Sequence, residues 1–210
     1  MFDDKGFDSW ADDYDKDVGQ TDKDNRFPFA GYERVIDGIC GIILEKGRSD
    51  VLDVGFGTGK LASRLYENGC RIYGQDYSQR MIELAKEKMP EATLYKQDFS
   101  KGLAEPLLAQ KYDFIVSTYA MHHLDEKGQI KLLDEFLECL KEDGKILIGD
   151  IAFETEEKLK QCKATIGDEW DDEESYFVFE RFKELYPSMT YTQISFCGAI
   201  LSLNKNNDNH

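Results

Sequence analysis

The sequence predicts an α/β protein with a doubly wound, mostly parallel sheet of seven strands and helices on both faces. Short apolar segments alternate with amphipathic segments from residue 49 onward. A glycine-rich turn, GFGTG at 55–59, directly follows the first apolar segment. The last two apolar segments, 189–196 and 198–204, are too close together for a helical crossover. They therefore predict an antiparallel strand pair at one end of the sheet.

Each element follows from local patterning. The expected strands are apolar and bounded by glycine or charged residues; they cover 49–55, 71–76, 92–98, 112–120, 144–153, 189–196 and 198–204. The expected helices carry an apolar stripe; they cover 60–69, 78–89, 126–144 and 177–187, and a further helix follows Pro28. Ser78 is a suitable cap for the second of these helices, and Pro90 ends it.

The length of 210 residues fits one domain with a cover. We expect an N-terminal helical cover at 1–48, a core at 49–203 with an acidic insertion at about 154–177, and a disordered tail at 204–210. The chain has 26 basic and 42 acidic residues, a net charge of −16. Such a charge repels phosphate backbones and anionic lipid, so nucleic acid is an unlikely partner and no membrane association is expected.

Five cysteines occur without any CxxC pair, which favours reduced, buried thiols in a cytoplasmic protein. The N-terminus lacks the apolar stretch of a signal peptide, and no apolar run approaches the ~20 residues of a membrane span. We find no cluster with the spacing of metal ligands and expect no metal. The sequence leaves the oligomeric state open between monomer and weak dimer.

The glycine turn indicates a nucleotide-like ligand. Its spacing is G-x-G-x-G, and Lys60 stands where the dinucleotide fingerprint has its third glycine. Asp53 lies in the strand two residues before the turn, where a carboxylate would repel a pyrophosphate. The same carboxylate would suit an ammonium or sulfonium group. This contrast favours S-adenosylmethionine over a nicotinamide dinucleotide, and so disfavours an oxidoreductase.

At this point VLDVGFGTG resembles the first motif of the class I S-adenosylmethionine-dependent methyltransferases, and the resemblance extends from about Phe7 to the last strand. It implies a Rossmann-like fold, S-adenosylmethionine as cofactor and S-adenosylhomocysteine as product. It also implies that Asp76 binds both ribose hydroxyls, that Tyr77 covers the adenine, and that Asp98 and Phe99 line the adenine pocket. The implied cofactor-binding residues are Asp53, Gly55, Phe56, Gly57, Gly59, Asp76, Tyr77, Met81, Asp98, Phe99 and Ser117. Small bacterial members of the family are the most similar.

The N-terminal segment FDSWADDYD places aromatic residues on one helical face, and it resembles a segment that folds over the cofactor in small methyltransferases. We expect Tyr14 to reach the site; the alternative is a helix that only stabilises the domain. Phe27, Phe29 and Tyr32 are candidates for the wall of an acceptor pocket, with core packing as the alternative.

Methyl transfer displaces an activated sulfonium, so the enzyme mainly positions the acceptor and sometimes removes a proton. The candidate catalytic residues are His123, Tyr14 and Tyr119, and for His123 a structural role fits equally well. We place Asp150 at the cleft mouth or at the start of the next helix. The segment STYA departs from the N/D-P-P-Y pattern of enzymes that methylate nucleic-acid amines or glutamine amides.

Six acidic residues surround Trp170 and Tyr176 in the segment 167–177. Carboxylates beside aromatic faces suit a cationic acceptor, and a solvated acidic loop is the alternative. The sequence therefore predicts a methyltransferase for a small molecule, with a cationic or amine-bearing acceptor as one option. Two alternatives stay open: a sensor that binds S-adenosylmethionine without turnover, and a protein or RNA methyltransferase.

Overall fold

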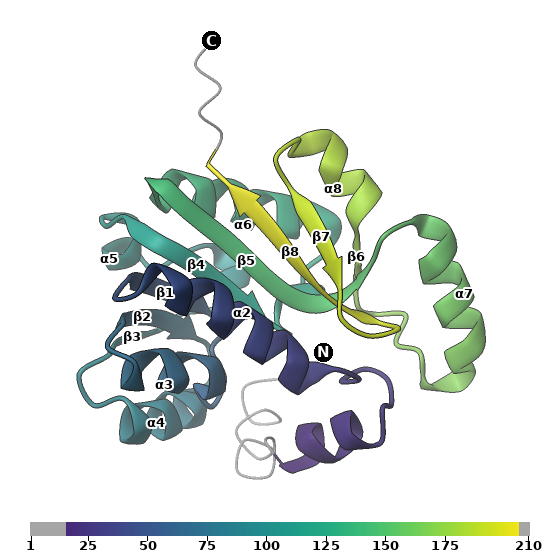
Figure 1. Cartoon of the computed structure of the whole chain (residues 1–210), viewed down its shortest axis with the longest axis horizontal. Coiled ribbons are helices and arrows are strands. Elements are labelled where there is room, and N and C mark those ends of the chain that lie inside the picture. Colours follow the sequence, from purple (N-terminus) through teal and green to yellow (C-terminus); the bar gives the residue numbers. More distant parts are fainter. Residues whose placement is uncertain (1–15, 206–210) are drawn as a thin grey trace.

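The computed structural model describes residues 16–205, and it forms one sheet covered by helices (Figure 1). In this part of the chain the strands run in the order β3-β2-β1-β4-β5-β8-β7, and the short β6 pairs with β5. Their bounds are Asp50–Val54 (β1), Arg71–Asp76 (β2), Thr93–Lys96 (β3), Tyr112–Thr118 (β4), Leu140–Phe153 (β5), Phe177–Val178 (β6), Thr190–Gln193 (β7) and Gly198–Asn204 (β8).

The pairing of the strands confirms the doubly wound prediction. The strands β1 to β5 pair in parallel, whereas β8 is antiparallel to both β5 and β7. The chain order reverses at β1, which lies between β2 and β4. A crevice at the carboxyl ends of these strands is the usual ligand site of such sheets.

Helices cover both faces of the sheet. Their bounds are Tyr32–Lys46 (α2), Lys60–Glu67 (α3), Gln79–Lys88 (α4), Glu105–Leu108 (α5), Glu126–Cys139 (α6), Glu156–Ile166 (α7) and Phe179–Leu185 (α8). In β4, Phe114 and Val116 join the core cluster under α2, α3 and α4, and Ile115 joins the cluster under α6. This alternation is the period of two that a sheet buried on both faces requires.

Helix α2 lies very close to the sheet. A Cβ atom added to Gly149 of β5 would lie 2.4 Å from Val35 Cγ1 and 2.8 Å from Ile39 Cδ1. The start of the same helix is fixed by Asp22, whose carboxylate accepts backbone N–H groups of Gly31 and Tyr32 at 2.7 and 3.1 Å. Asp22 therefore fixes the start of α2, and the close contact with β5 fixes the distance of the helix from the sheet.

Several expected boundaries were wrong, two of them because residues expected in a helix lie in a strand. The helix predicted over 126–144 ends at Cys139, because Leu140 is buried and pairs with Tyr112 past an irregularity of β4. The helix predicted from 177 begins at Phe179, after the two residues of β6. As predicted, Ser78 caps α4, since its Oγ accepts the Met81 N–H at 3.2 Å.

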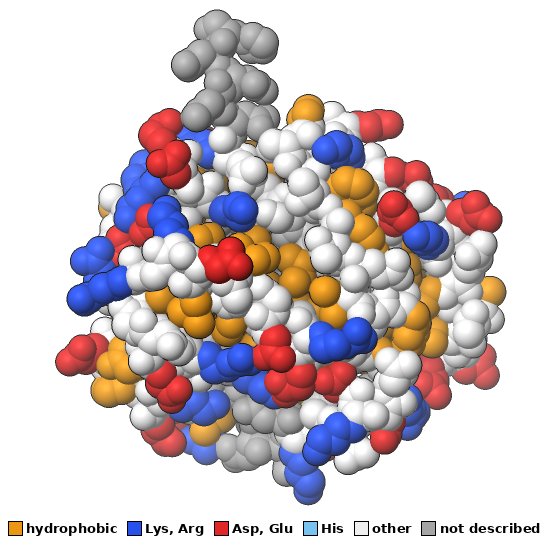
Figure 2. Space-filling model, viewed as in Figure 1, with side chains coloured by type: hydrophobic (Ala, Val, Ile, Leu, Met, Phe, Trp, Pro, Cys, Tyr) orange, Lys and Arg blue, Asp and Glu red, His pale blue; other side chains and the backbone are white. Residues whose placement is uncertain are grey.

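Basic and acidic side chains are interspersed on the face seen in Figure 2, and apolar side chains show between them. None of the helices within residues 16–205 combines the length and the apolar composition needed to cross a membrane.

Candidate functional site

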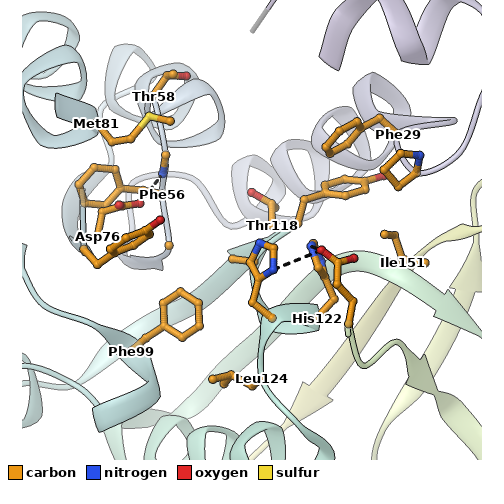
Figure 3. A pocket seen from close by; sticks show the side chains of 18 of the residues that line it. Phe29, Phe56, Thr58, Asp76, Met81, Phe99, Thr118, His122, Leu124 and Ile151 are labelled. Carbon is orange, nitrogen blue, oxygen red and sulfur yellow. Dashed lines mark hydrogen bonds and ion pairs between the residues drawn. The ribbon is translucent and has the colours of Figure 1, made fainter. Parts of the chain in front are cut away.

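A cavity of about 620 Å³ opens at the carboxyl ends of the parallel strands. This volume lies in the range of small-molecule sites. Figure 3 shows Phe56 and Asp76 toward one end, Phe29 and Ile151 toward the other, and Thr118 and His122 between them. We call these the cofactor end and the acceptor end. Of the expected cofactor residues, those that line the cavity are Gly55, Phe56, Gly57, Asp76, Tyr77, Met81, Asp98 and Phe99.

The glycine turn and Asp76 form one hydrogen-bonded unit. Oδ2 of Asp76 accepts the Gly57 N–H at 2.9 Å, and Oδ1 accepts the Ser78 N–H at 2.9 Å. Each carboxylate oxygen can accept more than one hydrogen bond, so this geometry leaves capacity for ribose hydroxyls. Gly55 has a φ of 72°, and a Cβ added there would lie 2.7 Å from the Cβ of Ala120. Only glycine allows this close approach.

Asp53 is an orphaned acidic group directly behind the turn. Its side chain is 1% exposed, and neither carboxyl oxygen has a hydrogen-bond partner among the described residues. Burial, and to a lesser degree the charge of Asp76, raises the pKa of Asp53 to about 8. A cofactor that brings a positive group to this end would compensate the buried charge, so the residues present fit S-adenosylmethionine.

Three expected cofactor residues do not line the cavity. Besides Asp53, these are Gly59, where an added Cβ would pack against Met89 and Ala85, and Ser117. The Ser117 hydroxyl is buried and donates to the Val54 carbonyl at 2.8 Å. Side chains alternate along a strand, so the next residue of β4, Thr118, lines the cavity instead.

An aromatic group forms the acceptor end. Tyr119 packs against Phe29 and Tyr32, with ring centroids 5.5 and 4.9 Å apart, and all three line the cavity. The φ of Tyr119 is 48°, a left-handed conformation that costs about 1–3 kcal/mol in a bulky residue. Its N–H donates to the Gly149 carbonyl at 2.8 Å, which holds this conformation. Strain of this kind is characteristic of functional sites.

Two histidines and two carboxylates meet between the two ends. His122 is buried, and its Nδ1 lies 2.6 Å from Oδ1 of Asp150. Oε1 of Glu174 lies 3.4 Å from His123 Nδ1 and 3.7 Å from His122 Nε2. Burial alone would lower the pKa of His122, but the carboxylates of Asp150 and Glu174 outweigh burial and raise it.

Asp150 differs from both expectations for it. It is fully buried rather than at a cleft mouth, and it accepts the backbone N–H groups of Met121 and His122 at 3.1 and 3.3 Å. The helix that follows is capped by Thr155, whose Oγ1 accepts the Lys158 N–H at 3.3 Å. Asp150 thus orders the histidine loop and caps no helix.

The acidic segment 167–177 divides between the cavity and the core. Asp171, Glu173 and Glu174 line the cavity. Trp170 instead stacks on Phe27 at 5.4 Å between centroids. Tyr176 meets Trp170 edge-on at 4.8 Å.

The aromatic residues of this segment, and Phe27, therefore pack outside the cavity lining, whereas three of its six acidic residues line the cavity. No pattern in the sequence indicated Glu174 as a partner of the histidines. Tyr14, the third candidate catalytic residue, lies outside the described residues.

The parallel sheet with an antiparallel end, the glycine turn, the acidic residue after β2 and the orphaned Asp53 together define a class I S-adenosylmethionine-dependent methyltransferase. The methyltransferase domain family matches residues 51–144. An uncharacterised methyltransferase of Alkaliphilus oremlandii is 35% identical over 183 residues, which are 86% of this chain and 80% of that protein. The chain belongs to this family.

Solved structures show the same fold. Magnesium protoporphyrin IX methyltransferase from Synechocystis with bound SAH has a TM-score of 0.66 at 18% identity, covering 84% of each chain. A TehB-like SAM-dependent methyltransferase from Corynebacterium glutamicum has a TM-score of 0.62 at 20% identity, covering 94% of this chain and 99% of that one.

Proposed function

We propose that this methyltransferase acts on a small cationic or amine-bearing acceptor. The observation that carries the proposal is the negative charge of the cavity lining, to which Asp171, Glu173 and Glu174 belong together with several aromatic rings. Carboxylates attract a cation, and aromatic faces add cation–π attraction. Lys60, a cation of the lining, is paired with Glu33 and lies 5.0 Å from the Tyr32 ring centroid. Its charge is thereby partly balanced.

The proposed cofactor contacts follow the geometry of the cofactor end. Asp76 binds the ribose hydroxyls, Phe99 and Tyr77 enclose the adenine, and Asp98 meets its amino group. Bound S-adenosylmethionine supplies a methyl group already activated on a sulfonium. The chain's own task is to align the acceptor with that methyl group and to exclude water.

We assign Tyr119 to the positioning of the acceptor, since its ring is fixed by Phe29 and Tyr32 and by a strained backbone. His123, with 39% of its side chain exposed, is the candidate that accepts a proton from an amine before or during transfer. Tyr14 is proposed to complete the cover over the site.

An acceptor screen tests the proposal. S-adenosylhomocysteine release is measured with separate pools of amines, thiols, alcohols and carboxylic acids, and we expect turnover in the amine pool. Glu173→Gln should raise KM for a cationic acceptor more than for its neutral analogue. Asp172→Asn is the matched control, because Asp172 belongs to the same segment but pairs with Lys163 outside the cavity lining.

Turnover of neutral or anionic compounds alone would contradict the assignment of the acceptor. Tight binding of S-adenosylmethionine with no product from any pool would favour a sensor over an enzyme.

A further inference from the structure

Three side chains with metal-ligand chemistry converge where the two ends of the cavity meet. They are the pair His122 and His123 of the turn after β4, and Glu174 of the acidic segment. One ligand atom from each lies within 4.8 Å of the others. We propose that these residues bind a divalent transition-metal ion. The metal site itself does not depend on the proposed acceptor; only its use in the reaction rests on the proposed function.

The distances are long for direct hydrogen bonds and would admit an ion between the groups. Glu174 Oε1 lies 3.4 Å from His123 Nδ1 and 3.7 Å from His122 Nε2, beyond the usual range of a nitrogen–oxygen hydrogen bond. Ligands that are each about 2.1 Å from a tetrahedral zinc ion lie about 3.4 Å from one another. The two distances to Glu174 are therefore already close to the spacing of a first coordination shell, and all three ligand atoms lie within 4.8 Å of one another.

Asp150 supplies the outer partner that metal-binding histidines commonly have. It lies 2.6 Å from Nδ1 of His122 and is itself held by the backbone N–H groups of Met121 and Ile151. When neutral His122 donates its Nδ1–H to Asp150, the lone pair of Nε2 is directed away from Asp150, on the side of Glu174. A lone pair and a carboxylate oxygen repel each other, so a positive species between them stabilises the arrangement.

The ligand set selects the class of metal. Two imidazoles and one carboxylate suit zinc, iron, cobalt or nickel rather than magnesium or calcium, which prefer oxygen ligands. Three protein ligands also leave coordination positions open. His123 and Glu174 have side-chain exposures of 39% and 22%, and both line the cavity. The open positions consequently face the space proposed for the acceptor.

Metal binding changes the proposed role of His123. As a ligand it no longer accepts a proton, and a heteroatom of the acceptor bound at an open position is acidified by the metal instead. Asp171 and Glu173 stay available to a cationic part of the acceptor. This inference departs from the sequence-based expectation of an enzyme without metal.

The test measures zinc binding by the full chain, produced without a histidine tag. Equilibrium dialysis against Zn²⁺ and elemental analysis give stoichiometry and affinity, and Co²⁺ is used as a spectroscopic probe. We expect about one ion per chain and visible Co²⁺ bands of a four- or five-coordinate site. Glu174→Gln and His123→Gln should abolish both, and Asp172→Asn should change neither. Asp150→Asn should weaken zinc binding by about 10–100-fold.

S-adenosylhomocysteine binding is measured by calorimetry on the same samples as the check of folding. A wild-type chain that binds this ligand but no Zn²⁺ at micromolar concentration would overturn the metal site alone. Equal zinc binding by wild type, Glu174→Gln and His123→Gln would overturn it too. Zinc binding lost in those two variants, with no methyl transfer in the acceptor screen, would support the site while refuting the proposed function.

Discussion

Asp53→Asn should remove a large pH dependence of folding stability. Burial raises the pKa of Asp53 from its ordinary value of 3.8 to about 8 in the folded chain. Between these values the folded chain retains the proton that the unfolded chain has lost. The free energy of unfolding therefore falls as pH rises through this window, and the loss is complete above about pH 8. Each pKa unit corresponds to about 1.4 kcal/mol, so the full loss is at most about 6 kcal/mol.

Asparagine is nearly isosteric with aspartate and stays neutral, so the variant should be close to wild type at about pH 4 and several kcal/mol more stable at about pH 8. Urea unfolding at intervals across this range measures the difference. Asp76 and Cys40 are the titratable neighbours coupled to Asp53, and the substitution leaves both in place. Asp172→Asn, a surface substitution, is the control for a general charge effect.

The same substitution should weaken S-adenosylmethionine binding, because it removes the buried carboxylate that a positive group of the cofactor would compensate. Stability and affinity would then change in opposite directions, as expected for a group retained for function. Parallel pH profiles for wild type and Asp53→Asn would refute this reasoning.

Three further substitutions probe the site and its support. Asp76→Asn should weaken S-adenosylmethionine binding by roughly 10–100-fold, because one oxygen acceptor of the glycine turn becomes a donor; calorimetry measures this, and unchanged affinity would contradict it. Gly55→Ala should lower the thermal midpoint, since the added Cβ would meet Ala120 at 2.7 Å; an unchanged midpoint would mean that the turn relaxes freely. Asp113→Asn should lower the free energy of unfolding at neutral pH. Burial would raise the pKa of Asp113, but its hydrogen bonds, of which the one from Lys141 is the strongest, lower the pKa to about 2. That stabilisation is present above about pH 4 and is lost as pH falls toward 2, so urea midpoints of the two proteins should converge in acid; a constant gap would argue against it.

The central strands β1, β4 and β5 were predictable because both of their faces are largely buried and their apolar runs are nearly continuous. The end of α6 was not, since Leu140 has the pattern of a helix residue and is drawn into β5 by pairing with Tyr112. Helix α7 has little of the apolar stripe that predicts a helix, because Cys162 is its only buried residue. Within residues 16–205, the element boundaries that local patterning missed thus depend on contacts with residues distant in the sequence.

Within the site, the place of the glycine turn and Asp76 at the cavity could be predicted because it depends on local spacing. Choosing Ser117 rather than Thr118 was an error of one residue in strand phase, which reverses the direction of the side chain. The link between His122 and Glu174 could not be predicted, because the return of a distant segment to the cavity brings them together. Asp150 was recognised as notable, but its contact with His122 depends on the packing of β5 beside β4.

The close approach of α2 to Gly149 has a consequence for how the range of acceptors could change. Tyr32 at the start of this helix forms part of the acceptor end, and the carbonyl of Gly149 holds the backbone of Tyr119 opposite it. A methyl group added at residue 149 would push the helix outward and thereby widen the chamber without altering any residue of its wall. One position beneath the helix could therefore adjust the size of acceptor that fits, leaving the chemistry of the wall unchanged.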